Sequence, residues 1–275
     1  MSARLANKTA LVTGATSNIG RAIAVAFAAE GAQVAASGRS HERGREVTEE
    51  IRAAGGHADF LTAHLDGSAR ASEDLAHEAV RVLGGRIDVL VNSAGIYPGL
   101  STAATDEAIF DEVYAVNVKA PFFLVAAIAP AMAENGGGAI INLGSWIARI
   151  GIPVGSLYSS TKGAIETLTR AWAAEFGRAG VRVNAISPGV IRSPTPPPAR
   201  WRCRPRGRAD DARHAGRRQR HARRHCARGC VPGQRRVHLR PRHGDRRRRR
   251  PGEYRRDSHV SDIRPRIPPD GPTDR

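Results

Sequence analysis

Cysteine is absent from the first 195 residues of this 275-residue chain. The three cysteines, Cys203, Cys226 and Cys230, all lie further along. Residues 1–195 therefore offer neither a disulfide framework nor a metal–thiolate site, and we expect no metal centre. The later segment His221–Cys230 contains histidine and cysteine, but its spacing matches no recognised zinc-finger pattern.

Long apolar runs are also missing. The longest, Ala120–Ala133, is interrupted by Pro130 and is shorter than the roughly 20 residues that cross a bilayer. The start of the sequence shows no apolar segment of the secretory-signal kind. We therefore expect a cytoplasmic protein with no membrane partner.

Lysine is scarce, and the basic residues are unevenly distributed. Residues 1–195 carry 3 Lys and 14 Arg against 18 acidic residues, whereas residues 196–275 carry 26 Arg, no Lys and 8 acidic residues. Only six Ile, Leu, Val, Met or Phe residues occur in that second segment. So small an apolar content cannot offset the entropy of ordering the chain. We expect a folded domain over 1–195, followed by a disordered or poorly packed Arg/Pro-rich tail over 196–275.

Within residues 1–195, short β-rich apolar runs alternate with longer amphipathic segments. The continuous apolar character of the runs is typical of strands that helices cover on both faces. After the first run, Ile23, Ala26 and Phe27 have helical spacing and Gly31 supplies a stop. Six such units in succession predict an α/β fold, a Rossmann-like doubly wound parallel sheet in three α/β/α layers. The predicted strands are Thr9–Gly14, Ala32–Arg39, Ala58–Ala63, Ile87–Gly95, Gly138–Ser145 and Val181–Gly189.

The first predicted strand leads through a glycine-rich turn, T-G-A-T-S-N-I-G over Thr13–Gly20, directly into a helix. Backbone N–H groups at such a turn can bind a pyrophosphate, although an ordinary strand-to-helix turn can contain the same glycines. The spacing resembles the T-G-x-x-x-G-x-G turn of the short-chain dehydrogenase/reductase family, except that Asn18 replaces the middle glycine. Because Asn enters the left-handed region readily, we expect the turn to persist. The resemblance implies cofactor contacts from Thr13, Gly14, Ser17, Asn18, Ile19 and Gly20.

The end of the second predicted strand bears on the choice of cofactor. Dinucleotide folds that prefer NAD place an acid there for the ribose 2′-hydroxyl, but this chain has Gly38 followed by Arg39. A guanidinium can pair with a 2′-phosphate and stack on adenine. We therefore predict NADP as the cofactor, with NAD as the alternative. A solvated surface arginine is the simpler interpretation of Arg39.

Further cofactor contacts follow from the family resemblance alone. It implies that Asp66, in H-L-D-G, lies at the adenine edge of the cofactor. It implies that the N-S-A-G motif forms the turn beneath the cofactor ribose, with contacts from Asn92, Ala94 and Gly95. The P-G-V-I-R-S segment is implied to engage the nicotinamide carboxamide, with contacts from Pro188, Gly189 and Ser193.

The strongest chemical pattern is Y-S-S-T-K, which places Tyr158 and Lys162 one turn apart on the same helix face. A nearby ammonium favours the phenolate, so we expect the pKa of Tyr158 to fall from about 10 toward neutrality. Ser145 follows the fifth predicted strand, at the sheet edge where a hydroxyl can hold a substrate carbonyl oxygen. The resemblance implies a fourth catalytic member, Asn117, which holds a water for proton relay, and it brings Tyr158 and Lys162 to the cofactor as well.

Each of these four side chains has an ordinary alternative: a helix tyrosine, a solvated lysine, a helix cap or a buried amide. Their joint occurrence behind a dinucleotide turn makes coincidence improbable. We predict an oxidoreductase that transfers a hydride between NADP(H) and a small-molecule carbonyl or alcohol, with Tyr158 as general acid and base. The alternative is a catalytically inactive dinucleotide-binding protein whose basic tail binds nucleic acid, but no interleaved aromatics or folded module accompany the arginines.

The resemblance covers about residues 5–195 and stops in P-T-P-P-P-A-R-W. With synonymous codons allowed, a frame shifted by one base turns Arg220–Tyr254 into a segment resembling the family's closing helix, seventh strand and D-G-G turn. We therefore hypothesise a frameshifted C-terminus, because GC-rich coding read out of frame yields excess Arg, Pro and Gly. Losing the seventh strand would expose a sheet edge and part of a subunit interface. We expect a homo-oligomer if the C-terminus is intact.

Overall fold

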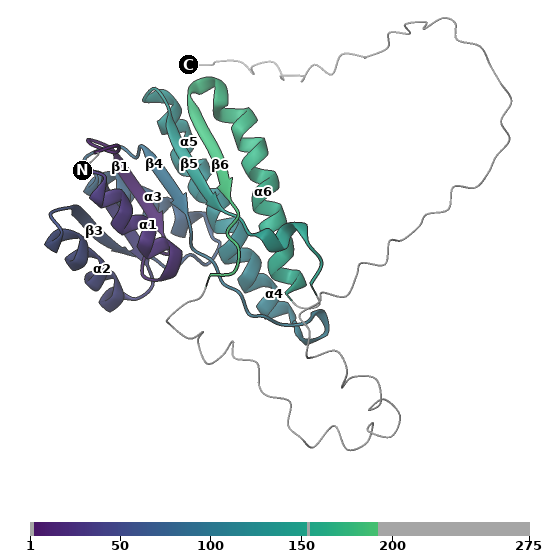
Figure 1. The fold of residues 1–275 in the computed structure, drawn as a ribbon. Coiled ribbons are helices and arrows are strands. Elements are labelled where there is room, and N and C mark those ends of the chain that lie inside the picture. Colours follow the sequence, from purple (N-terminus) through teal and green to yellow (C-terminus); the bar gives the residue numbers. More distant parts are fainter. Residues whose placement is uncertain (1–2, 153–154, 192–275) are drawn as a thin grey trace, which may run out of the picture. The chain divides into compact units, whose positions relative to one another are not determined.

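The described part of the chain is built on a six-stranded parallel sheet (Figure 1). The structure, a computed structural model, describes residues 3–152 and 155–191, so Ser193 and the predicted tail over 196–275 lie outside the described residues. The strand order is β3-β2-β1-β4-β5-β6, and every neighbouring pair is parallel. The strands are β1 (Thr9–Thr13), β2 (Gln33–Gly38), β3 (His57–Thr62), β4 (Val89–Asn92), β5 (Gly138–Leu143) and β6 (Val181–Ile186).

This order confirms the predicted doubly wound sheet. The chain runs outward from β1 to β3, then returns to add β4 on the other side of β1. The point between β1 and β4, where the strand order reverses, is where open α/β sheets bind ligands. All six predicted strands extended too far at their carboxyl ends, because the residues there belong to loops: Gly14, Arg39, Ala63, Ser93–Gly95, Gly144–Ser145 and Ser187–Gly189. These loops form the edge of the sheet at which the predicted site residues gather.

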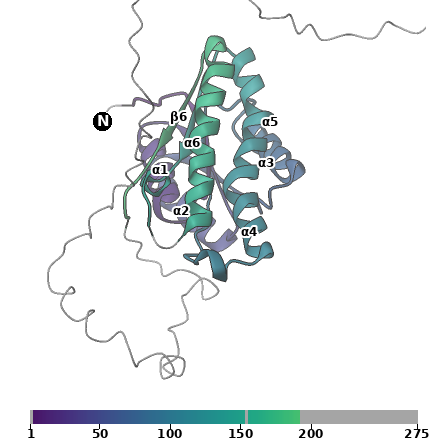
Figure 2. The ribbon, with the colours of Figure 1, turned by 90° about the vertical axis from the view of Figure 1, so that its right-hand side faces the viewer.

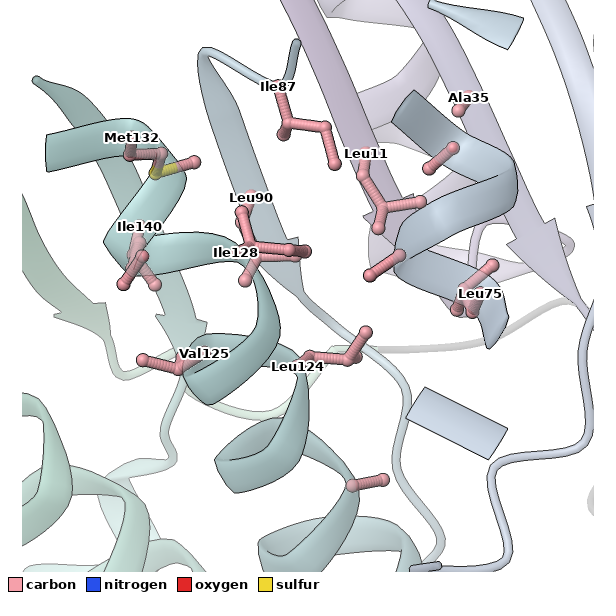
Figure 3. Close-up of a cluster of buried hydrophobic side chains, with 14 of the residues drawn as sticks. Leu11, Ala35, Leu75, Ile87, Leu90, Leu124, Val125, Ile128, Met132 and Ile140 are labelled. Carbon is pink, nitrogen blue, oxygen red and sulfur yellow. The ribbon is translucent and has the colours of Figure 1, made fainter. Parts of the chain in front are cut away.

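Helices cover both faces of the sheet. On one face α1 (Asn18–Ala29) and α2 (His41–Ala53) pack against strand residues such as Val12, Val34 and Val91. On the other face α3 (Ala69–Val82), α5 (Ala120–Glu134) and α6 (Ser156–Phe176) lie side by side (Figure 2). Because successive side chains of a strand alternate between faces, Leu11, Leu90 and Ile140 point into this second layer (Figure 3).

One apolar helix crosses the second layer. It runs from Glu107 to Glu134 through α4 (Glu107–Tyr114), a π-helical turn at Ala115–Lys119 and α5. Its length and hydropathy would suit a membrane span, but the α5 residues Leu124, Val125, Ile128 and Met132 are buried against the sheet (Figure 3). We identify it as a core helix of this domain.

Helix α5 continues without a break through Pro130 to Glu134. A proline inside a helix leaves the carbonyl four residues earlier without its usual donor. That carbonyl belongs to Ala126, and both Ala126 and Pro130 are exposed, so water can take the place of the missing N–H.

Leu90 provides a test of this core assignment. Its side chain lies in the central strand β4 with none of its surface exposed. We expect Leu90→Ala to lower the free energy of unfolding by about 2–5 kcal/mol, because it leaves a cavity between sheet and helices. Urea denaturation of both variants should show that the control Val190→Ala, at a residue 79% exposed, changes stability by less than about 0.5 kcal/mol. Equal losses in the two variants would contradict the assignment.

Candidate active site

The glycine-rich turn after β1 is shaped by close backbone contacts. Gly14 has a φ of +65°, and a Cβ built on it would lie 2.8 Å from the Cα of Ala94. A Cβ on Gly20, in the first turn of α1, would collide with the Gly14 carbonyl oxygen. Asn18 adopts the left-handed conformation with a φ of +48°, so the turn keeps its shape without the middle glycine.

These observations fit a dinucleotide. The two glycines let the turn fold back against the loop after β4, where Ala94 faces Gly14 and the Ser93 hydroxyl faces Gly20. The first turn of α1 contains no acidic residue that would repel a phosphate. The half-buried Ser17 and Ile19 complete the start of this helix.

The Thr13 side chain links β1 to the loop after β4. Its buried hydroxyl donates to the Val91 carbonyl at 3.2 Å and accepts from the backbone N–H groups of Ser93 at 3.0 Å and Ala94 at 3.1 Å. The side chain therefore holds the exit of β4 against the exit of β1. It positions the loop that carries Ala94 and Gly95.

Arg39 is exposed and makes no hydrogen bond or ion pair with any other residue in the described ranges. Gly38 before it faces Thr16, whose Cγ2 would lie 2.5 Å from a Cβ at that position. An acid at position 38 would therefore not fit without displacing Thr16. This end of β2 presents a free guanidinium and no carboxylate.

Asp66 lies in an exposed loop just before α3. Its Oδ1 accepts hydrogen bonds from the Ser68 hydroxyl at 2.7 Å and the Ser68 backbone N–H at 2.8 Å. These bonds lower the pKa of the Asp66 carboxyl. The carboxylate is thus charged and held at the start of the helix.

The predicted catalytic pair lies together on α6. The Lys162 Nζ is 5.5 Å from the centre of the Tyr158 ring. Lys162 is buried, with 5% of its surface exposed, and donates to the Leu143 carbonyl at 2.7 Å. Burial lowers the pKa of this ammonium to about 8. A cation that titrates near neutrality is therefore held between α6 and the end of β5.

The expected lowering of the Tyr158 pKa is wrong for the free protein. Burial raises the pKa of the phenol, a hydrogen bond with Ser145 partly opposes this, and the neighbouring Tyr97 raises it further. The Lys162 ammonium is directed to the Leu143 carbonyl rather than to the phenol oxygen, so it does not outweigh the loss of solvent. The free site holds Tyr158 as a protonated phenol, the form needed in a proton donor.

Ser145 and Asn117 complete the group that the sequence predicts. Ser145 is buried at the exit of β5, where its hydroxyl meets the Tyr158 phenol and caps the 3₁₀ turn Trp146–Arg149. Asn117 is buried in the π-helical turn. A Cβ on Gly95 would lie 3.3 Å from Asn117 Oδ1 and 3.7 Å from Lys162 Nζ. The loop after β4, the π-helical turn and α6 therefore converge.

Both polar atoms of the Asn117 amide have protein partners. Its Oδ1 accepts from the Ile96 backbone N–H at 2.8 Å, and its Nδ2 donates to the Ile96 carbonyl at 3.0 Å and to the Thr161 hydroxyl at 3.1 Å. This side chain fastens the loop after β4 to α6. The family resemblance implies that this residue holds a water, and its side chain already makes three hydrogen bonds to protein atoms.

The remaining predicted cofactor residues divide into two groups. Pro188 and Gly189 follow β6 beside the Ser145 loop, because the Pro188 carbonyl accepts from the Trp146 N–H at 3.3 Å. Asn92 points between the strands instead, where its Nδ2 donates to Asn142 Oδ1 at 2.9 Å. Its buried Oδ1 has no partner among the described residues. The Asn92 side chain thus links β4 to β5.

Two residues near this group were not singled out from the sequence. The Tyr97 ring lies 4.8 Å from the Tyr158 ring, centre to centre, and is 46% exposed, so it forms a wall beside the phenol. Glu166 is buried on α6 one turn beyond Lys162. The four-residue spacing of Tyr158, Lys162 and Glu166 puts all three on one helix face, so the sequence could have revealed Glu166. No local pattern marks Tyr97.

Comparison with known proteins agrees with this geometry. The model of the family described as short chain dehydrogenase matches residues 8–200. The chain belongs to the short-chain dehydrogenase/reductase family. As a member it is an oxidoreductase by descent, and an uncharacterized oxidoreductase from Thermotoga maritima is 42% identical over 186 residues, which cover 68% of this chain and 72% of that protein.

Solved members of the family share the fold. A metagenomic short-chain oxidoreductase in complex with NADP is 36% identical with a TM-score of 0.64, and the match covers 68% of this chain and 84% of that one. A 7α-hydroxysteroid dehydrogenase complexed with NADH is 35% identical with a TM-score of 0.66, covering 70% and 74%. Nicotinamide cofactors of both kinds therefore occur among the relatives of this short-chain dehydrogenase.

Gly20→Ala tests the dinucleotide turn. The new Cβ would collide with the Gly14 carbonyl, and relieving an overpacked contact typically costs about 1–3 kcal/mol. We expect NADPH binding, followed by nucleotide fluorescence, to weaken roughly tenfold or more. The control is Gly163→Ala on α6, where nothing lies within 4 Å of the added atom. Unchanged binding by Gly20→Ala would exclude this turn as the nucleotide site.

The charge of Lys162 can be measured directly, because Lys8 and Lys119 are the only other lysines. We expect an NMR titration of labelled lysine side chains in the free protein to show one ammonium losing its proton near pH 8. Lys162→Met should remove that transition, while the signals of the exposed Lys8 and Lys119 remain as internal references. A Lys162 signal that titrates at its ordinary value of 10.5 would show that burial does not control this charge.

Proposed function

We propose that this short-chain dehydrogenase transfers a hydride between NADP(H) and the carbonyl or alcohol group of a small molecule. The observation that carries the proposal is the convergence of Ser145, Tyr158 and Lys162 beside the loop of Gly95. It combines a hydroxyl, a protonated phenol and a buried cation at the edge of the sheet where Gly14 and Gly20 form their turn.

The residues have distinct roles in this proposal. The turn Gly14–Gly20 and the first turn of α1 hold the pyrophosphate of the cofactor, and Asp66 lies toward its adenine. Ala94, Gly95, Pro188 and Gly189 lie toward its ribose and nicotinamide, which supplies or accepts the hydride when bound. The Ser145 hydroxyl holds the substrate oxygen, and Tyr158 gives the proton to that oxygen in reduction or takes it in oxidation.

Proton supply to Tyr158 runs through Lys162 in this proposal. The ammonium lies under the phenol ring, close to Gly95 and Asn117. Because the Asn117 amide is committed to Ile96 and Thr161, its backbone carbonyl in the π-helical turn is the group that would hold a relay water. A π-helical turn widens the helix and frees backbone groups of this kind.

The preference for NADP rests on the end of β2. Arg39 is exposed and free of ion pairs within the described residues, so it can pair with a 2′-phosphate at no cost to other contacts. Thr16 beside Gly38 occupies the space in which an NAD-preferring acid would stand. Charge-assisted pairing of Arg39 with the 2′-phosphate favours NADP. The end of β2 offers no carboxylate to bind the ribose 2′-hydroxyl of NAD.

A frameshifted C-terminus remains our proposal for residues 196–275. The family match ends at residue 200, and the matched part covers 72% of the relative from Thermotoga maritima, so more than a quarter of that protein lies outside it. Sequencing the gene from its source decides the matter, because an unbroken frame that encodes these arginines would reject the shift. With the frame restored, we expect a cytoplasmic homo-oligomer.

The function is tested by oxidation of NADPH and NADH with a panel of carbonyl compounds, using both the chain as written and a frame-restored version. We expect NADPH to be preferred. Tyr158→Phe should lower kcat by about 10²–10⁴-fold, because the proton donor is lost. Arg39→Ala should weaken NADPH use by roughly tenfold or more and leave NADH unaffected, because only NADPH carries the phosphate.

Arg178→Ala, at another exposed arginine, is the matched control for Arg39→Ala. It should change the rate of oxidation of neither NADPH nor NADH. A Tyr158→Phe variant with full activity would refute the mechanism. Equal loss of NADPH and NADH use in Arg39→Ala would refute the role of the guanidinium, whatever the substrate proves to be.

A further inference from the structure

Glu166, on α6, joins the loop after β5 to the loop after β6. Its carboxylate accepts from the Ser187 hydroxyl at 2.7 Å through Oε1 and from the Arg149 Nε at 3.1 Å through Oε2. Ser187 directly follows β6, and Arg149 ends the 3₁₀ turn that Ser145 begins. One buried carboxylate on α6 therefore holds the exits of both β5 and β6.

Backbone contacts join the same two loops. The Gly144 N–H donates to the Ile186 carbonyl at 2.8 Å, and the Trp146 N–H donates to the Pro188 carbonyl at 3.3 Å. A Cβ on Gly144 would lie 2.8 Å from Ser187 Oγ and 3.3 Å from Glu166 Oε1, so the glycine leaves room for this junction. The loops that carry Ser145 and Pro188 are thus packed around the carboxylate.

The charges around Glu166 keep it ionised. Burial would raise the pKa of its carboxyl, but the hydrogen bonds from Ser187 and Arg149, with the charges of Arg149 and Arg170, lower it below the ordinary value. Lys162, one turn earlier on α6, is directed to the Leu143 carbonyl instead. A buried charge that lost these donors would be costly, so the geometry of both loops depends on their contact with Glu166.

We propose that Glu166 is a positioning residue that fixes the Ser187–Gly189 loop against the Ser145 loop and so shapes the nicotinamide end of the cofactor site. This rests on the proposed function for the identity of the ligand, whereas the coupling of the two loops stands on the contacts above. The other end of that site, at Gly14, Gly20 and Arg39, belongs to the turns after β1 and β2 and makes no contact with Glu166.

The separation of the two ends gives a sharp test. In Glu166→Gln the side chain keeps its shape but loses its charge, and its NH₂ faces a donor. We expect NADPH to bind the full chain about tenfold more weakly, whereas 2′,5′-ADP, which lacks the nicotinamide, binds as before. Hydrogen exchange of the Gly144 and Trp146 amides, measured without nucleotide, should accelerate. Glu175→Gln, exposed on the same helix, should change none of these values.

Ser187→Ala provides a second variant that removes one hydrogen bond from an exposed residue and leaves the buried carboxylate in place. It should shift NADPH binding in the same direction by a smaller factor. Equal weakening of NADPH and 2′,5′-ADP in Glu166→Gln, or unchanged exchange at Gly144 and Trp146, would overturn the inference. If exchange accelerates but the unaltered chain binds neither nucleotide, the loop coupling stands and the NADP assignment falls.

Discussion

The hydrogen bond between the Lys162 ammonium and the Leu143 carbonyl is the contact on which the site depends. It places a cation inside the protein at the end of strand β5, two residues before Ser145. A buried ammonium needs such a partner, because an unpaired one would be strongly destabilised. Since Lys162 also lies against Tyr158, this bond fixes the phenol, the cation and the strand exit relative to each other.

Three residues at four-residue spacing give α6 its chemical face. Tyr158 meets Ser145, Lys162 meets the end of β5, and Glu166 meets the loops after β5 and β6. Each successive turn of the helix thus reaches a different part of the same sheet edge. The helix acts as a rigid support on which the loops are aligned, and rigid elements hold such geometry better than loops alone.

Much of this arrangement was predictable from the sequence. Apolar runs located all six strands, and the order of the glycine turn, Ser145 and Y-S-S-T-K located the edge at which they meet. Side-chain partners were not predictable, because they depend on packing between distant segments. Thr13, Asn92 and Asn117 therefore turned out to hold loops and strands together, and burial reversed the expected direction of the Tyr158 pKa.

The π-helical turn at Ala115–Lys119 also constrains how this part of the chain can change length. A π-helical turn contains one residue more than the same turn of a regular α-helix. Each residue that follows is therefore rotated by about 100° from the place it would have in a regular helix of the same length. The rotation sets which side of α5 faces the sheet. Straightening the turn without removing a residue would swing Leu124, Ile128 and Met132 out of the core together, whereas deleting one residue would remove the bulge and leave them facing the sheet. At its present length, this helix therefore needs the π-helical turn to keep its apolar side against the strands.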